Sequence, residues 1–394
     1  MGGSPRVSVL PGQQLPDLDW AGELTQLTSA WPYLGPTWLT ATETAMPQAQ
    51  PWHTIATRAR GELALAAGYI LDAPPAADHE PRTYLGWRPA GDEVSAEVDA
   101  LGTGPFFPAL LLGSPLGYRT EVAYNFWTPA LMSAVVDALA PAAFKAGVRC
   151  VVAPWIPDRR GNEALVDALV RAGGHSTFWG YEGFLRLDAG SWAEHLAGMP
   201  AKTRQRITVG VRDCAASGVI IERADGPGVR PYITRVAELT CLIREKDGAG
   251  AEPSHIAEPL TALLDGGADV RAYLGWKDGA LVASCVCIGK DHRLFVKWAG
   301  FDYAAVGESS GICFAIVLDA PVRDAYADGL RTVEFGAGAD WARALPGCTS
   351  RTMTTVMIFS DPQLRLRAAR WLDTFGTSRH AAFGNQSHDR KDRR

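Results

Sequence analysis

Apolar and polar residues alternate along three neighbouring stretches in the second half of the chain. A period of two predicts β-strands, here at residues 270–276, 281–288 and 293–298. The first two stretches are separated by Asp278-Gly279, and Asp-Gly between alternating runs is typical of a hairpin. The pattern therefore predicts a meander of three antiparallel strands.

Apolar residues with helical spacing alternate with further short strands along the rest of the chain. Residues 131–146 are predicted to form a helix that stops at Gly147 and leads into a buried strand at 149–155. Ser191 and Glu194 have the spacing of a capping box, so a helix is expected to begin there. The same patterns predict helices at 31–45, 162–172, 231–246, 255–264 and 362–374 and strands at 177–187, 219–223 and 352–359.

The stretch 300–338 joins a loop rich in Gly and Ser, a long apolar-faced helix and a short strand. Residues 317–320 (VLDA) match residues 135–138 (VVDA), and a glycine and an arginine follow at the same spacing in both places. Helix–glycine–strand is a common pattern, but a constant offset indicates two copies of one fold. We therefore expect an N-terminal domain over 1–188, a C-terminal domain with the main site over 189–375, and a disordered basic tail over 376–394.

Composition and charge narrow the class of protein. The chain is 47% hydrophobic and 21% charged, with a net charge of −5, which is typical of a globular protein and argues against DNA binding. The N-terminus lacks the pattern of a signal peptide, and no apolar run is long enough to span a membrane. We expect a cytoplasmic protein. Its seven cysteines are scattered, which predicts reduced thiols and no metal site.

Three motifs in the second half of the chain carry a family resemblance. They are Ser191-Trp192 followed by the basic run from Lys202 to Arg206, then Trp298-Ala-Gly300-Phe-Asp302, then VEFGAGAD at 333–340. Their order and spacing resemble GNAT-type acyltransferases, and most closely the FemAB-like branch with two such domains in tandem. The resemblance covers residues 31–375. It implies an α/β fold of two tandem GNAT-like domains, each with a mixed central sheet flanked by helices.

The resemblance implies an acyl donor at the loop that precedes the helix expected at 311–328. Backbone N–H groups at a helix N-terminus are suited to phosphate, so the candidate cofactor-binding residues are Gly307, Ser309, Ser310 and Gly311. An ordinary helix cap is the alternative interpretation of these residues. Glu308 departs from the family pattern, because it places a negative charge in the loop, which carries no basic residue. The donor is therefore left open between acyl-CoA and aminoacyl-tRNA.

Acyl transfer to an amine also requires a group that removes a proton. Glu334 lies in a strand predicted to be buried, on the opposite face from Val333 and Phe335, and is the candidate general base. Asp340, just after the Gly-Ala-Gly turn, is the second catalytic candidate and would hold the amine. An ion-paired strand end is the alternative interpretation of Glu334.

The candidate substrate-binding residues are two basic side chains on one helix and three residues near the third strand of the meander. Lys202 and Arg206 share a helix face at a spacing of four, which suits a phosphate-bearing donor but also a solvated helix. Alternation predicts Lys297 on the opposite face from Trp298, whereas Trp298 and Tyr303 are interpreted either as pocket residues or as core aromatics.

The sequence thus predicts an N-acyltransferase that moves an acyl group from acyl-CoA to an amine. The acceptor would be a small molecule or a cell-envelope or natural-product precursor. One alternative is an aminoacyl-tRNA-dependent transferase that forms a peptide bond. The other is a non-catalytic binding protein of the same fold. The acyl group, the acceptor and the oligomeric state are left open.

Overall fold

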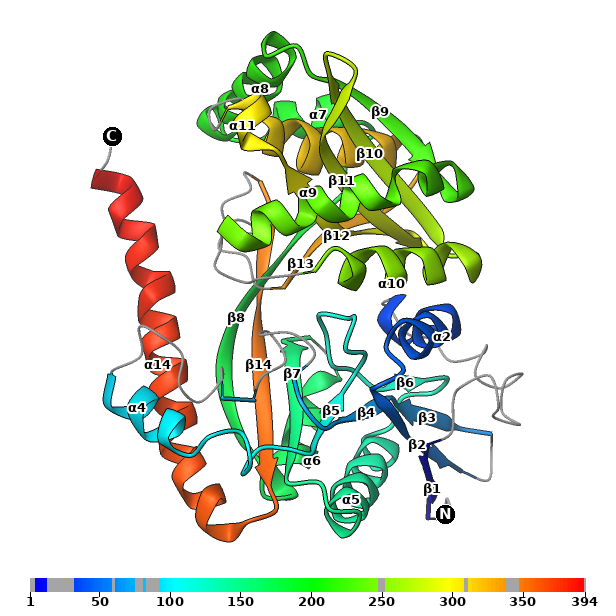
Figure 1. Cartoon of the computed structure of the whole chain (residues 1–394), viewed down its shortest axis with the longest axis vertical. Helices are drawn as coiled ribbons and strands as arrows, with labels where there is room; N and C mark the ends of the chain where they lie inside the picture. Colours follow the sequence, from blue (N-terminus) through cyan, green and yellow to red (C-terminus); the bar gives the residue numbers. More distant parts are fainter. Residues whose placement is uncertain are drawn as a thin grey trace. The chain divides into compact units, whose positions relative to one another are not determined.

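The computed structural model describes residues 4–12, 32–58, 61–74, 81–82, 92–159, 161–246, 252–307, 311–337 and 347–392 (Figure 1). The chain divides into two compact units. Unit 1 comprises Met1–Gly180 and Arg351–Arg394, and unit 2 comprises Tyr181–Ser350. The chain passes from one unit to the other inside two strands, β8 (His175–Arg186) and β14 (Thr349–Phe359).

Unit 1 has a sheet with the strand order β6-β3-β2-β4-β5-β7-β14, and β1 pairs with β2. Its neighbouring strands are antiparallel, except that β5 and β7 run parallel. The remaining strands of unit 1 are β1 (Arg6–Pro11), β2 (Gln50–Thr57), β3 (Leu63–Ala66), β4 (Gly68–Leu71), β5 (Ala109–Leu112), β6 (Ala123–Tyr124) and β7 (Cys150–Pro157). Its helices are the 3-10 helix η2 (Pro32–Leu34), α2 (Pro36–Ala45), α4 (Asp92–Ala100), α5 (Pro129–Lys145), α6 (Asn162–Arg171) and α14 (Pro362–Asp392).

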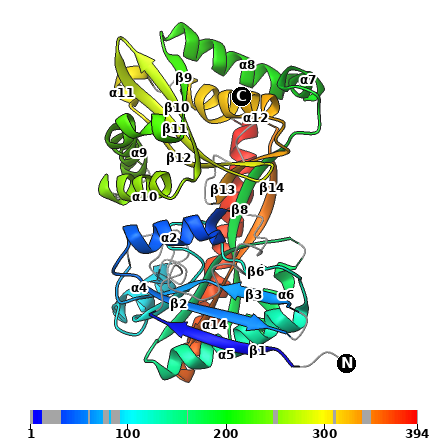
Figure 2. The same cartoon turned by 90° about the vertical axis from the view of Figure 1, so that its right-hand side faces the viewer.

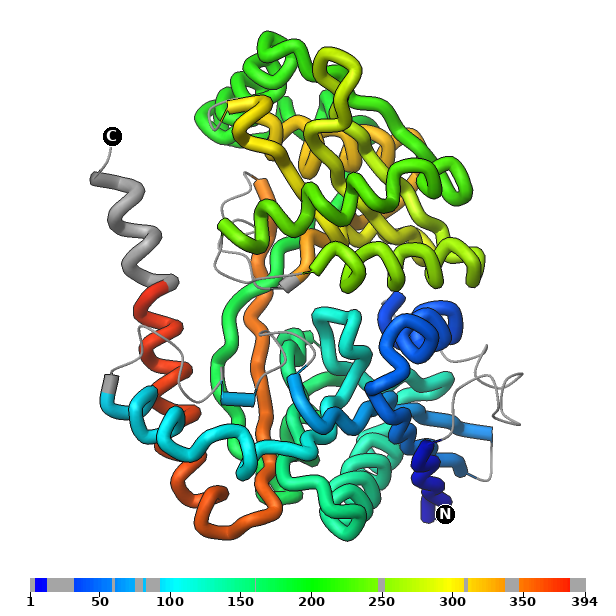
Figure 3. Tube along the Cα trace, viewed as in Figure 1, coloured from blue at the N-terminus to red at the C-terminus, as the bar shows by residue number. Residues whose placement is uncertain are grey.

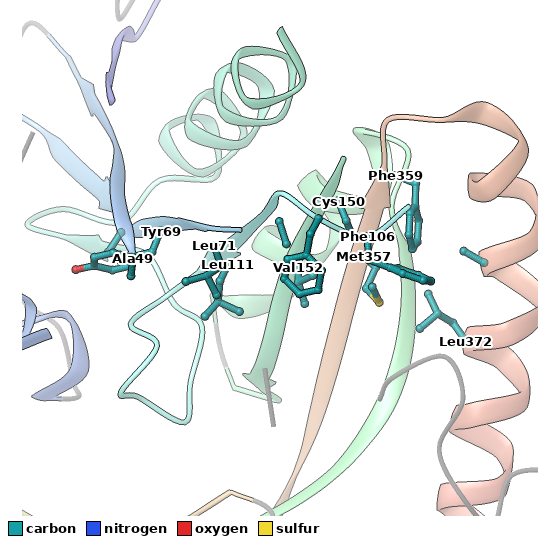
Figure 4. Packing of buried hydrophobic residues seen from close by; sticks show 14 of the residues in the cluster. Ala49, Tyr69, Leu71, Phe106, Leu111, Cys150, Val152, Met357, Phe359 and Leu372 are labelled. Atoms are coloured by element: carbon teal, nitrogen blue, oxygen red, sulfur yellow. The ribbon is translucent and has the colours of Figure 1, made fainter. Parts of the chain in front are cut away.

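Helices cover both faces of this sheet. On one face, α2, α4 and α14 close a core that includes Phe106, Met357 and Leu372 (Figure 4). On the other face, α5 and α6 pack through residues such as Leu139 and Leu169. Strands β5 and β7 are buried on both faces, which accounts for their uninterrupted apolar sequences, ALLL and CVVAPWIP.

Unit 2 has a sheet with the strand order β8-β13-β12-β11-β10-β9. Only β12 and β13 are parallel, and the other neighbours are antiparallel. The strands are β9 (Ile220–Asp225), β10 (Asp269–Lys277), β11 (Ala280–Lys290), β12 (Arg293–Phe301) and β13 (Thr332–Ala337). The helices are α7 (Trp192–Gly198), α8 (Ala201–Ala216), the 3-10 helix η4 (Gly226–Tyr232), α9 (Ile233–Lys246), α10 (Ser254–Asp265), α11 (Tyr303–Val306), the π-helix η5 (Phe314–Asp319) and α12 (Ala320–Ala327).

Two close backbone contacts fix the helices of unit 2. One holds α9 against the sheet, and the other holds α8 against the start of the helical segment that contains η5 and α12. Helices α9 and α10 cover one face, whereas η5, α12 and α8 cover the other (Figure 2). A Cβ atom on Gly300 of β12 would lie 2.2 Å from the backbone carbon of Leu239 in α9. On the opposite side, a Cβ atom on Gly311 would lie 2.1 Å from the carbonyl oxygen of Gly210 in α8. Only glycine fits at such contacts.

The sequence repeat is confirmed as a repeated supersecondary unit. In unit 1 the chain runs from β5 through α5 to the parallel strand β7, and in unit 2 from β12 through η5 and α12 to the parallel strand β13. Figure 3 traces both passages. Cys150 and Thr332, which begin β7 and β13, are separated by the same number of residues as the matched VVDA and VLDA motifs.

The helix expected at 311–328 is not a regular α-helix. Residues Ile312–Cys313 are helical, and they lead into the π-helix η5 and then α12. Pro321 lacks the N–H that would bond to the carbonyl of Val317 in an α-helix. The missing bond favours the wider turn just before it, which local sequence periodicity does not reveal.

Residues 351–375, assigned from the sequence to the C-terminal domain, lie in unit 1. They do so because β14 pairs with β7 and α14 contributes Trp371 and Phe375 to the core of unit 1. The helix also continues beyond Thr374 to Asp392. Gly376 lies against Thr177 and Arg379 is buried, so this part of the tail is ordered and not disordered as expected. None of the described helices combines the length and the apolar character needed to cross a membrane.

We predict that Gly300→Ala destabilises unit 2, because the added methyl group collides with the backbone of α9. The expected loss in the free energy of unfolding is about 1–3 kcal/mol, the usual cost of overpacking. Urea denaturation followed by circular dichroism measures it. Gly198→Ala is the matched control, since a Cβ atom there meets nothing within 4 Å. Equal midpoints for the two variants would contradict the tight contact.

Candidate active site

The parallel strands β12 and β13 stay paired over only three residues. The pairs are Arg293 with Thr332, Leu294 with Val333 and Phe295 with Glu334. Beyond this point β13 continues along β8, and β12 continues along β11. Each strand carries one extra residue there, Lys297 in β12 and Phe335 in β13. Bulges bend a strand and redirect its side chains, so the pair Phe295 and Glu334 marks where the two strands separate.

Three ionisable side chains are buried on the sheet face that α9 and α10 cover. Glu182, Glu334 and Lys297 expose 0%, 2% and 8% of their surface. Glu334 pairs with Phe184 of β8, and Glu182 lies two residues from Phe184 on the same face. The residues beside them in the strands face the opposite core, with η5 and α12: Leu185, Val296, Val333 and Phe335.

Neighbouring groups offset part of the cost of burying these charges. The Nη1 atom of Arg293 lies 3.9 Å from Oε1 of Glu334. The Nζ atom of Lys297 lies 5.4 Å from the centroid of the Trp298 ring, a favourable cation–π distance. A buried charge is expensive unless it is compensated. One lysine and two glutamates gathered on one buried face are therefore a candidate functional site.

The placement of Lys297 differs from the sequence prediction. Alternation puts Lys297 and Trp298 on opposite faces, but their side chains are in contact. Lys297 is the extra residue of the bulge, because Val296 pairs with Cys287 and Trp298 pairs with Val286. Because of this extra residue, Lys297 and Trp298 face the same side of the sheet, and alternation resumes after them. Trp298 is buried and lies beside Lys297.

Glu182 is a candidate that the sequence analysis missed. It is the one acidic residue of the strand segment HSTFWGYEGFLR, for which the sequence analysis predicted a strand and no site residue. A fully buried carboxylate in such a strand is a recognisable anomaly, because glutamate is almost never buried without compensation. Its proximity to Glu334 depends on the pairing of β8 with β13, which local sequence does not show.

A second feature of the candidate site is the start of the helical segment Ile312–Ala327. Gly311, with φ +66°, packs against Gly210 of α8. One turn earlier in α8, the guanidinium of Arg206 lies 5.2 Å from the centroid of the Phe314 ring. Burial raises the pKa of the neighbouring Cys313 thiol to about 11, and the charge of Arg206 opposes this shift. A basic side chain thus lies at the helix N-terminus, contributed by α8 rather than by the loop.

Other predicted site residues take different positions. Tyr303 is the first residue of α11. The Nζ atom of Lys246 lies 4.5 Å from its ring centroid, and the ring centroid of Phe301 lies 5.6 Å away. The ring packs against the core of unit 2, as a core aromatic does. Lys202 is exposed in the first turn of α8. Gly307 ends α11 with φ +82°. Ser309, Ser310 and Asp340 lie outside the described residues. In the described part of the chain, no group of three or more His, Cys, Asp or Glu side chains is placed to hold a metal ion.

Two hydrogen bonds join α7 to the helical segment Ile312–Ala327. The indole Nε1 of Trp192 donates to Oδ1 of Asp319 at 2.7 Å, and Nδ1 of His195 lies 2.7 Å from the hydroxyl of Tyr326. Ser191 caps α7 by accepting from the N–H of Glu194, as its capping-box spacing predicts. The Ser191-Trp192 motif therefore holds α7 against η5 and α12.

No family model and no curated protein matches the sequence. Comparison with solved structures nevertheless defines the class of fold, a tandem arrangement of two GNAT domains. A tandem GNAT protein from the clavulanic acid biosynthesis pathway superposes with a TM-score of 0.51 and 12% sequence identity, over 91% of this chain and 99% of the other. The C-terminal DUF2156 domain of a protein described as a lysylphosphatidylglycerol synthetase, from Agrobacterium fabrum, gives a TM-score of 0.50 and 11% identity, over 85% and 93%. These likenesses establish the expected α/β fold with mixed sheets flanked by helices.

We predict that unit 2 loses stability in mildly acidic solution through His195. Burial lowers the pKa of His195 below 6.5, and the Asp188 carboxylate opposes this shift. The unfolded state therefore binds the proton first as the pH falls. Stability is full above pH 6.5 and is lost between 6.5 and the lower folded-state pKa. An imidazole titration by NMR measures that pKa, and His195→Gln should weaken the pH dependence of the unfolding midpoint. A folded-state pKa above 6.5 would exclude this mechanism.

Proposed function

We propose that unit 2 is an N-acyltransferase that moves an acyl group from acyl-CoA to a primary amine. One observation carries the proposal: β12 and β13 separate beside the buried group formed by Glu182, Glu334 and Lys297. Separated parallel strands give a thioester access to backbone groups, and buried carboxylates provide a proton acceptor. The tandem GNAT fold supports this assignment, because acyl transfer is the reaction that the sequence resemblance implies.

The donor is proposed to bind with its phosphates at the start of the helix near Gly311. The N–H groups of a helix N-terminus and its dipole favour a negative charge, and Arg206 lies beside that turn. Lys202 lies one turn earlier on the same face of α8. The roles of Gly307, Ser309 and Ser310 in holding the phosphates are part of the same proposal.

The acceptor is proposed to enter as an ammonium ion between Glu334 and Glu182. Glu334 takes a proton, and the neutral nitrogen attacks the thioester carbonyl carbon. A C–N bond forms, the C–S bond breaks, and the leaving thiolate of CoA takes the second proton that the nitrogen loses as the amide forms. Glu182 holds the amine, whereas Lys297 provides a compensating positive charge. Asp340 is proposed to contact the same amine.

An aminoacyl-tRNA donor is the second candidate. The exposed basic residues of α8 favour it, since Lys202, Arg206 and Arg212 all lie on that helix. Thermal-shift measurements with acetyl-CoA, longer acyl-CoAs and charged tRNA distinguish the donors. Binding of tRNA would fall steeply with salt, whereas binding of a single CoA would depend on salt weakly. If none of these donors shifts the melting temperature, both transferase functions are excluded and a non-catalytic binding protein remains.

Arg206→Ala is expected to weaken acetyl-CoA binding about 10- to 100-fold, the effect of losing one charge-assisted contact of 1.5–3 kcal/mol. Isothermal titration calorimetry measures the dissociation constant. Arg212→Ala is the control, because Arg212 lies on the same helix but pairs with Asp213 at 3.3 Å and is exposed. If both variants bind acetyl-CoA equally well, the donor does not lie at this helix N-terminus.

Glu334→Gln is expected to lower kcat by roughly 10²- to 10⁴-fold, the usual contribution of a general base, with donor affinity unchanged. Steady-state release of free CoA with an amine acceptor measures the rate. Glu182→Gln should instead raise KM for the amine more than it lowers kcat. Glu222→Gln, on the exposed strand β9, is the matched control. Turnover of Glu334→Gln at the wild-type rate would remove Glu334 from this role.

A further inference from the structure

Unit 1 contains its own copy of the separating strand pair. Strands β5 and β7 are parallel and pair at Ala109 with Cys150, Leu110 with Val151 and Leu111 with Val152. Strand β5 ends at Leu112, whereas β7 continues to Pro157. Helix α5 connects them, as η5 and α12 connect β12 and β13. The space beyond Leu112 in unit 1 therefore corresponds to the proposed donor position in unit 2.

The chain of unit 1 returns to this space directly after β5. It turns at Gly113, which has φ +87°, and a Cβ atom there would lie 2.8 Å from the carbonyl oxygen of Arg119. Thr120 then bonds to both strands. Its N–H donates to the carbonyl of Trp155 in β7 at 3.3 Å, and its hydroxyl donates to the carbonyl of Leu112 in β5 at 2.8 Å.

The residues around Thr120 are packed as core and not as a surface loop. Arg119, Thr120, Glu121 and Val122, here called the plug segment, are all buried. Glu121 Oε1 lies 3.0 Å from Nε of Arg159, just beyond the end of β7. Removing the plug segment from between the strands would break both hydrogen bonds of Thr120 and leave the buried Glu121 carboxylate without this guanidinium, which is costly.

In unit 2, the described residues that follow β12, 302–307, do not turn back between the two parallel strands. After β12, the N–H of Asp302 donates to the carbonyl of Val282 at 2.9 Å, and Lys277 Nζ donates to the carbonyl of Ala305 at 2.9 Å. Helix α11 is thus held against the hairpin of β10 and β11. The described residues 302–307 therefore lie on the β11 side of β12, away from β13.

We infer that the plug segment occupies the donor groove of unit 1, so that the chain binds a single acyl donor, in unit 2. The carbonyl groups of Leu112 and Trp155, which would accept from the amide N–H groups of a donor, already accept from Thr120. That this space is a donor groove rests on the acyl-transfer function proposed above, whereas its occupation rests on the contacts and burial of the plug segment. Unit 1 then serves as scaffold or acceptor surface and not as a second donor site.

Hydrogen exchange of the full-length protein tests the occupation directly, without any donor. The amide of Thr120 is expected to exchange as slowly as those of β7. Thr120→Val removes the bond to Leu112 and should speed exchange of the plug segment about fivefold, the effect of one typical hydrogen bond. Thr374→Val is the control, because the hydroxyl of Thr374 donates to the carbonyl of Arg370 within α14. Exchange of the plug segment at the rate of an exposed loop would overturn the inference.

Equilibrium dialysis with radiolabelled acetyl-CoA tests the consequence. One molecule per chain is expected at saturation, and Arg206→Ala should weaken that single class of sites. Two molecules per chain, or a class of sites that Arg206→Ala leaves unaffected, would overturn the inference. If no acetyl-CoA binds at all, the proposed donor is wrong, and hydrogen exchange alone decides whether the plug segment fills the groove.

Discussion

The parallel pairing of β12 with β13 lasts for three residues, and the buried charges of unit 2 are arranged around the point where it ends. Phe295 and Glu334 are the last pair. Both strands gain an extra residue just beyond, at Lys297 and Phe335. Without the bulge in β12, Lys297 and Trp298 would face opposite cores. With it, a cation and its aromatic partner lie on the same face as Glu334, so the local backbone irregularity assembles the candidate site.

Glycine contacts hold the two sides of this site in place. On one face of the sheet, Gly300 lets α9 lie directly on the backbone of β12, and on the other face Gly311 lets the helix start lie on Gly210 of α8. The second contact also determines where Arg206 lies, because Arg206 precedes Gly210 by one turn of the same helix. The loop before the helix carries Glu308 and no basic residue. The positive charge at the helix N-terminus is instead supplied by α8.

Local sequence patterns predicted most helices, most strands and the repeat, because periodicity and turn residues act over a few positions. They did not predict features set by pairing between distant residues. The assignment of residues 351–375 to unit 1 follows from the pairing of β14 with β7, about 200 residues earlier. Glu182 joins Glu334 only through the pairing of β8 with β13. The bulge at Lys297 has no signature in the apolar and polar pattern of the strand. Alternation alone therefore places Lys297 and Trp298 on opposite faces, whereas they contact each other.

The two copies of the repeat share a parallel strand pair and a crossing helix but differ in one connecting segment. Both copies provide a parallel pair that ends early and a helix that crosses between the strands. They differ in the segment that leaves the first strand. In unit 1 that segment turns back at Gly113, and Thr120 bonds to both strands, so the space is filled by backbone and buried side chains. In unit 2 Asp302 caps α11 and its N–H bonds to Val282, which draws the described segment toward the neighbouring hairpin. The two copies thus differ in the residues that leave the first strand, and not in the parallel strand pair or the crossing helix.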